Sequence, residues 1–110
     1  MFKTFFIFVI CTLCVSARSQ PATKPDSTVA DVEIDNFTFK PQRLVIYKGT
    51  RVHWINKDDV PHTATSNDKK FDSKAMDTDE SFTFQFDDTG LFKYFCAVHP
   101  HMTGEILVKE

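Results

Sequence analysis

The feature that most constrains this chain of 110 residues is a short stretch near its C-terminus, CAVHPHM at residues 96–102. It places a thiol, an imidazole and a thioether at the spacing C-x2-H-x2-M. The apolar run before it, LFKYF at residues 91–95, predicts a strand that gives the Cys96 sulfur a rigid base, so one tight loop presents three donors to one ion. Two sulfur donors and an imidazole together suit copper, which cycles between two oxidation states.

Such a site needs one more imidazole, and His62 in the sequence VPHT (residues 60–63) is its expected source. We expect the residues after His62 to form a short strand of their own, so the site joins two separate parts of the chain. The predicted metal ligands are His62, Cys96, His99 and Met102, with the methionine as a long, weak axial ligand. The expected cofactor is a single copper ion.

His101 is the alternative to His99 within the loop. In the longer C-x4-H type of loop, the axial methionine would fall at Glu105 or Ile106, and neither side chain is a thioether. We therefore expect His101 to be an exposed neighbour of the site. Met76 is an alternative axial ligand, but its place in a polar part of the sequence favours local packing or a position at the rim of the site.

Residues 1–17 carry the features of a secretory signal peptide. Lys3 supplies a short positive region, residues 5–15 form an apolar core, and VSA at residues 15–17 offers a cleavage site. A retained membrane anchor is the alternative, but the apolar run is shorter than the roughly 18 to 20 residues that span a bilayer. We therefore expect cleavage and a protein that is periplasmic or otherwise exported, with no membrane contact afterwards.

The segment at residues 18–28 holds two prolines and several polar residues, which is typical of a flexible leader. The folded copper-binding domain is expected at residues 29–110. Cleavage of the signal also removes Cys11 and Cys14, so Cys96 is left without an internal disulfide partner. A free thiol in an oxidising compartment is open to oxidation, and a bound metal would protect it.

The charge of the chain is mildly acidic, with 13 lysine and arginine residues against 15 aspartate and glutamate residues. Nucleic-acid-binding proteins usually present a basic face, and none is visible in this sequence, so no nucleic-acid partner is expected. The acidic groups at residues 58–59, 77–80 and 87–88 are expected to be solvated surface; if one of them steers a basic partner, association slows at high salt. We expect a monomer.

Apolar residues at every second position predict short strands through most of the folded domain. In SFTFQF (residues 81–86), for example, three aromatic side chains alternate with three polar ones. The first strand is expected to run from Val32 through Phe39, with a bend at Asn36. About seven such runs with turn signals between them predict an all-β sandwich.

The segments around the predicted ligands, residues 60–64 (VPHTA) and 94–108, resemble the plastocyanin and amicyanin branch of the cupredoxins, and the short loop is most similar to amicyanin. The likeness extends over essentially all of residues 29–110. It implies a cupredoxin-like Greek-key β-sandwich or barrel of about seven to eight strands and a single type 1 (blue) copper ion. By the same resemblance, both histidines bind through Nδ1, and the Nε2 edge of His99 lies at the surface as the exit of the electron.

The function implied by this resemblance is that of a one-electron carrier between redox partner proteins, without substrate chemistry. The alternative is a copper chaperone or scavenger that hands its ion over, although such proteins usually use exposed ligands rich in methionine or histidine. An enzyme is not expected. Multicopper oxidases need more histidines than the four present here, and a binuclear copper centre needs a second cysteine in the loop.

Two residues depart from the family pattern. Thr63 stands where many relatives have an asparagine that ties the two ligand segments together, so the tie is expected to be weaker or made by a hydroxyl. Val98 stands where amicyanin-like loops often have proline, and its N–H could point at the Cys96 sulfur. Such a hydrogen bond would stabilise the reduced state, so the substitution Val98→Pro is expected to lower the reduction potential.

Overall fold

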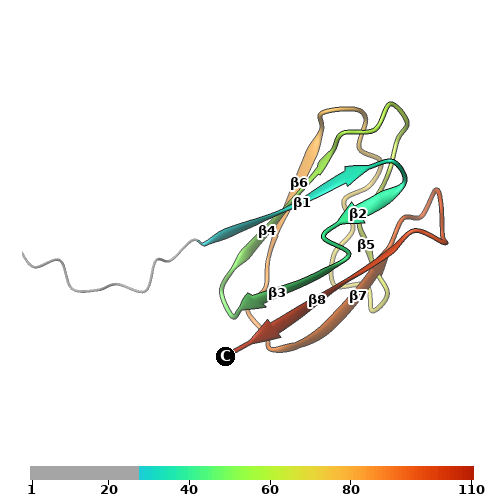
Figure 1. The fold of residues 1–110 in the computed structure, drawn as a ribbon. Coiled ribbons are helices and arrows are strands. Elements are labelled where there is room, and N and C mark those ends of the chain that lie inside the picture. Colours follow the sequence, from blue (N-terminus) through green and yellow to red (C-terminus); the bar gives the residue numbers. More distant parts are fainter. Residues whose placement is uncertain (1–27) are drawn as a thin grey trace, which may run out of the picture.

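The computed structural model describes residues 28–110 (Figure 1). The predicted signal peptide at residues 1–17, and all but the last residue of the predicted leader at residues 18–28, lie outside the described residues. Within the described part, the chain forms no helix that is long and apolar enough to cross a membrane.

Two sheets of four strands each make up the described domain (Figure 1). The first sheet has the strand order β2-β1-β4-β6, and the second has the order β3-β8-β7-β5. The pairs β1–β4 and β3–β8 are parallel, and the other neighbouring strands are antiparallel. The all-β Greek-key sandwich expected from the sequence is confirmed. The strands are β1 Val29–Asp35, β2 Thr38–Lys40, β3 Arg43–Tyr47, β4 Arg51–Asn56, β5 Thr65–Ser66, β6 Ser81–Gln85, β7 Gly90–Phe95 and β8 Thr103–Lys109.

Alternating side chains build the core between the two sheets. Along β4, Val52 and Trp54 are fully buried, whereas Arg51 at its start is exposed. The Trp54 ring lies 5.2 Å from that of Phe71 and 5.5 Å from that of Tyr94, measured between centroids. Aromatic pairs at such distances stabilise a core by about 0.5–1.5 kcal/mol beyond the burial of their area. This aromatic core holds the two sheets, and hence the segments that follow them, in fixed positions.

The first predicted strand is in fact two strands joined by a tight hairpin. Asn36 and Phe37 form the two-residue turn between β1 and β2, with φ angles of 51° and 57°. Positive φ at both central residues is what a type I′ hairpin turn requires. The prediction of a single bent strand from Val32 to Phe39 is therefore wrong. Apolar residues alternate with polar ones on both sides of the turn, and no glycine marks the turn in the sequence.

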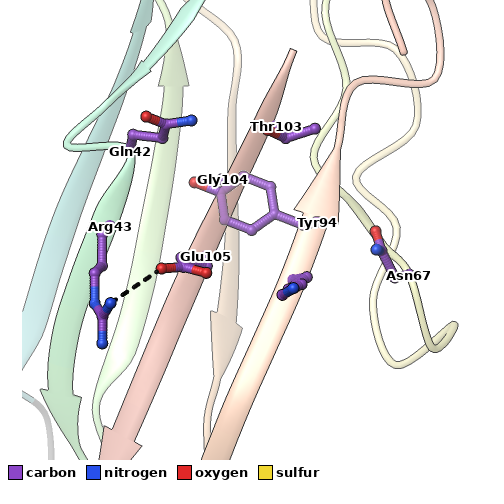
Figure 2. Close-up of a pocket in the computed structure, with 8 residues that line it drawn as sticks. Gln42, Arg43, Asn67, Tyr94, Thr103, Gly104 and Glu105 are labelled. Carbon is purple, nitrogen blue, oxygen red and sulfur yellow. Dashed lines mark ion pairs between the residues drawn. The ribbon is translucent and has the colours of Figure 1, made fainter. Parts of the chain in front are cut away.

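The ring of Tyr94 in β7 lies across Gly104 of the neighbouring strand β8 (Figure 2). A Cβ atom at position 104 would lie only 2.4 Å from the Tyr94 Cζ atom, so this approach requires glycine. Burial raises the pKa of Tyr94 to about 12. The contact locks β7 against β8 two residues before Cys96.

The two predicted ligand segments lie beyond the ends of core strands. After β7 ends at Phe95, the chain enters the loop at residues 96–102 and returns in β8. In Figure 1 this loop and the β1–β2 turn lie at the end of the sandwich away from the C-terminus. His62 lies between β4 and β5 and is paired through its backbone with Met76. The fold thus brings residues separated by more than thirty positions to one end.

Candidate metal centre

Three of the four predicted ligands present their donor atoms to one another. The Cys96 Sγ atom lies 3.6 Å from His62 Nδ1 and 3.8 Å from His99 Nδ1. The three donor atoms all lie within 4.8 Å of one another. His62 and Cys96 are fully buried, whereas His99 is half-buried. A strand end, a separate connecting segment and a tight loop therefore converge on one point.

His62 is oriented by the Asp58 carboxylate on the far side of its ring. The distance between His62 Nε2 and Asp58 Oδ2 is 2.7 Å. A carboxylate accepts hydrogen bonds, so Nε2 carries the proton and donates it, and Nδ1 keeps its lone pair directed at the Cys96 sulfur. The backbone of His62 is fixed as well, because its N–H and C=O pair with those of Met76 at 3.2 and 2.8 Å.

The Asp58 carboxylate also binds the β1–β2 turn. Its Oδ1 accepts the N–H of Asn36 at 2.7 Å, and its Oδ2 accepts the N–H of Phe37 at 2.9 Å. Burial favours the neutral form of this carboxyl group, but the N–H groups of Phe37 and Asn36 and the His62 ring outweigh it and hold the pKa of Asp58 below its usual range. The prediction that residue 58 is solvated surface is wrong, because Asp58 is buried beneath the turn.

The tie between the two ligand segments is made by the Thr63 hydroxyl. Ala97, directly after Cys96, donates its N–H to Thr63 Oγ1 at 2.7 Å. The Thr63 hydroxyl also pairs with that of Thr65 at 2.8 Å. The expectation of a hydroxyl tie is confirmed. Because the threonine side chain is short and has few rotamers, its hydroxyl holds the segments that contain His62 and Cys96 close together.

Thr63 is also the residue that donates a hydrogen bond to the sulfur. The Thr63 backbone N–H donates to Cys96 Sγ, with 3.4 Å between nitrogen and sulfur. Among the described residues, no hydrogen bond joins the Val98 N–H to this sulfur, and the Val98 side chain is half-exposed. The predicted Val98 hydrogen bond is therefore wrong: the backbone of residue 63, which enters from the opposite segment, provides the N–H instead.

The loop itself is held by two backbone hydrogen bonds. Cys96 donates its N–H to the Met102 carbonyl, and Met102 donates its N–H to the His99 carbonyl, each at 2.9 Å. Met102 is buried and His101 is exposed, as expected. Met76 is buried in the core, which agrees with the local packing predicted for it.

Phe37, like Asp58, has a place at the site that the sequence did not reveal. Its ring stands at right angles to both imidazoles, with its centroid 5.4 Å from that of His62 and 5.1 Å from that of His99. Half of the Phe37 side chain is exposed. The signal that could have placed it is the pair Asn36–Phe37 between two alternating runs, which is the length of the shortest hairpin turn.

The residues present fit a copper ion. The buried cysteine sulfur accepts an N–H hydrogen bond, which would stabilise a thiolate, and the Nδ1 atoms of both imidazoles face it. A donor set of one thiolate and two imidazoles is the trigonal arrangement of blue copper sites. Zinc would prefer a fourth strong ligand, and a thioether is a poor one for it. The arrangement is thus suited to an ion that gains and loses one electron with little movement of its ligands.

A cavity of about 420 Å³ on the second sheet lies apart from this cluster (Figure 2). Its walls include Gln42, Lys93 and the ion pair between Arg43 and Glu105, whose Nη1 and Oε1 atoms lie 3.4 Å apart. None of the metal-cluster residues lines this cavity. The metal cluster therefore lies outside this hollow.

The sequence matches the family described as cupredoxin-like domain over residues 4–108. Amicyanin from Paracoccus versutus is 28% identical over 100 residues, which make up 86% of this chain and 72% of that protein.

Solved structures show the same likeness. A purple cupredoxin from Nitrosopumilus maritimus is 32% identical, with a TM-score of 0.70. The match covers 73% of this chain and 99% of that one. A copper-containing nitrite reductase from Thermus scotoductus is 28% identical with a TM-score of 0.69, but the match covers 74% of this chain and only 22% of the reductase. The match thus spans nearly the whole of a separate cupredoxin but only a small part of the reductase.

Proposed function

The chain belongs to the cupredoxin family, in the amicyanin branch, and we propose that it carries single electrons between redox partner proteins. The observation that carries the proposal is the convergence of His62 Nδ1, Cys96 Sγ and His99 Nδ1 within 4.8 Å. The sulfur is buried and the outer imidazole is not. A closed thiolate site with one ring toward solvent is suited to moving electrons while the ion stays in place.

Copper as the cofactor, expected from the sequence, is confirmed by membership of this family and by the histidine–cysteine–histidine cluster. We assign the ligands as His62, Cys96, His99 and Met102. Met102 completes the set because its backbone is tied to Cys96 and His99 and its side chain is buried in the same loop. A methionine there would act as the weak axial ligand.

The residues of the chain hold this site in one geometry. Asp58 fixes the His62 ring in the tautomer that exposes Nδ1 to the cluster. The Thr63 N–H stabilises negative charge on the Cys96 sulfur. When bound, copper supplies the one-electron chemistry. Because the ligands are held by the scaffold before the ion arrives, little rearrangement accompanies either oxidation state.

The path of the electron to a partner is proposed to pass through His99. Its Nδ1 faces the sulfur, and its Nε2 makes no hydrogen bond to any part of the chain that the structure describes. A half-buried ring with a free outer edge can contact another protein directly. The partners themselves are proposed to be redox proteins that dock over this end of the sandwich, and the protein is proposed to act as a monomer.

We also propose the organisation expected from the sequence: a signal peptide at residues 1–17, a leader at residues 18–28 and the copper domain at residues 29–110. The mature protein would then be periplasmic or otherwise exported. Loss of Cys11 and Cys14 with the signal would leave Cys96 as a single cysteine, which supports a metal-bound role for it. Intact-mass measurement of the exported protein would locate the cleavage site directly.

An enzymatic role receives no support from the reductase likeness, since that match spans 22% of the reductase. A copper chaperone would need a site that releases its ion readily. The buried Cys96 and His62, and the hydrogen bonds that lock the loop, favour retention instead. We therefore propose that the protein is not an enzyme and keeps its copper during turnover.

Colour tests the proposal. Addition of Cu(II) to the apoprotein should give an intense visible absorption band from thiolate-to-copper charge transfer, and Cys96→Ser should abolish it. His101→Ala is the matched control, because that side chain is exposed and outside the proposed ligand set; its band should equal that of the wild type. A colourless copper complex of the wild type would contradict the assignment.

A further inference from the structure

Phe37 has two features that stability alone does not favour. Its large apolar side chain is 50% exposed, and its backbone has a φ of 57°, a region that bulky residues rarely occupy. Strain of this kind is concentrated at functional sites, where the surrounding structure compensates for it. A glycine would suit the turn better, so the phenyl ring itself is the feature that needs an explanation.

The Phe37 ring contacts the two histidines of the cluster. It meets each imidazole edge to face, at centroid distances of 5.4 and 5.1 Å, while the imidazoles lie 5.0 Å from one another. The three rings therefore form a nearly equilateral triangle. Among the described residues, Phe37 is the one aromatic side chain in contact with both imidazoles. It covers the seam between His62 and His99 on the side toward solvent.

The ring is fastened in this position through the backbone of its turn. The Asp58 carboxylate accepts the N–H groups of Asn36 and Phe37 and also binds the His62 ring. On either side of the turn, β1 and β2 are paired from Asp35 and Thr38 onward. The turn cannot swing away without breaking hydrogen bonds to a buried carboxylate, so the cover is fixed relative to His62.

Other apolar groups at this end do not replace it. Val98, Pro61 and Pro100 are exposed at the rim, and none of them carries an aromatic ring that could stack against an imidazole. A small anion that passed between the two imidazoles would approach the cluster from this side. A planar ring over this seam is therefore placed to decide whether a small molecule can approach.

We propose that Phe37 is a gate that closes the copper site to small exogenous anions and so confines its chemistry to electron transfer. The gate rests on the proposed function, because it requires copper at the cluster. It makes Phe37 a positioning and specificity-determining residue, not a ligand. The chain would thereby exclude the inner-sphere reactions that an open copper site can perform.

The test is an azide titration of the Cu(II)-loaded protein, followed by visible absorption and electron paramagnetic resonance. Phe37→Gly removes the ring and suits the positive φ of the turn, so the hairpin is retained. We expect azide to leave the spectra of the wild type unchanged and to shift those of Phe37→Gly. The apparent azide affinity should rise at least tenfold, which corresponds to about 1.4 kcal/mol.

Leu91→Ala is the matched control. Leu91 is 49% exposed, nearly the same as Phe37, but lies on β7 outside the cluster; its variant should respond like the wild type. If Phe37→Gly fails to hold copper, the azide titration is repeated with Phe37→Ala, which also removes the ring but keeps a side chain. Equal azide responses of the wild type and the ring-deleted variant would overturn the gate. A wild type without a blue band would contradict the proposed function before azide is added, and the gate with it.

Discussion

The two histidines of the centre face the same sulfur but sit in opposite surroundings. His62 is completely buried, its backbone is paired with Met76, and its Nε2 is bound by Asp58 at 2.7 Å. His99 is half-buried in a short loop, and the described residues offer its Nε2 no partner. One imidazole is held on every side by the fold, whereas the other is held on one side only.

This difference divides the work of the site between its two halves. The scaffold half, which comprises His62, Asp58 and Thr63, sets the geometry that both oxidation states must share. The loop half, which comprises His99 and its neighbours, is the part through which we propose that partners are contacted. A carrier needs both properties, because a rigid site without an outlet is isolated and an open site without a rigid base is slow to exchange electrons.

Deletion of each imidazole in turn should reveal the difference between the two histidines most strongly. His62→Gly and His99→Gly should both lose the blue absorption band. Free imidazole added to the solution should restore the band in His99→Gly, because its vacated space opens to solvent, and should fail in His62→Gly, whose site is buried. If imidazole rescued both variants, or His62→Gly alone, the two histidines would not differ in solvent access as the structure indicates.

Loss of the Asp58 carboxylate should have the next largest effect. Asp58→Ala leaves the His62 Nε2–H and the N–H groups of the β1–β2 turn without their acceptor, so we expect the free energy of unfolding of the apoprotein to fall by about 2–4 kcal/mol. Copper affinity should drop about 10–100-fold, as for other groups that orient a ligand. Denaturant unfolding and chelator competition measure the two effects.

Asp59→Ala is the control for this variant, because Asp59 is adjacent and exposed. Its free energy of unfolding should stay within about 0.5 kcal/mol of the wild type. If the two variants behave alike, Asp58 does not have the orienting role that its contacts indicate.

The tie between the two halves should contribute less. Thr63→Val keeps the shape of the side chain but removes the hydroxyl that accepts the Ala97 N–H. We expect the apoprotein to lose about 1 kcal/mol of unfolding free energy and the copper off-rate to increase. Thr63→Ser, which retains the hydroxyl, should remain close to the wild type; an equal loss in both variants would point to packing and not to the hydrogen bond.

The smallest effect is expected at Val98. Among residues 28–110, the hydrogen bond to the Cys96 sulfur comes from the Thr63 N–H and not from the Val98 N–H. Val98→Pro therefore removes no donor from the sulfur, and its midpoint potential should equal that of the wild type. A clear fall in the midpoint by voltammetry would show that the Val98 N–H does act on the sulfur.

The proposed donors could be named from the sequence because their signals are local. Cys96, His99 and Met102 lie within seven residues after an alternating strand, and His62 stands in a short motif of its own. The alternating runs likewise predicted the sandwich, since each strand buries one face. Spacing and periodicity are properties of neighbouring residues, so they can be recognised without knowledge of the fold.

The supporting residues could not be anticipated in this way. Asp58 stands in a polar turn beside Asp59, and nothing in that sequence distinguishes a buried carboxylate from a solvated one. Its burial arises only when the β1–β2 turn folds over it. Phe37 was hidden for a different reason: it stands two residues before Phe39, so it was counted as part of an alternating strand although it is out of phase with Val32 and Ile34. Both roles depend on contacts between segments about twenty residues or more apart.

Cyclic voltammetry of the copper-loaded protein tests the central claim most directly. A carrier with a rigid His62 half and an open His99 half should give one reversible one-electron couple, with the same copper content before and after repeated cycles. The blue band should disappear on reduction and return in full on oxidation. An irreversible wave, or loss of copper to an acceptor protein during cycling, would contradict electron transfer and support copper delivery instead.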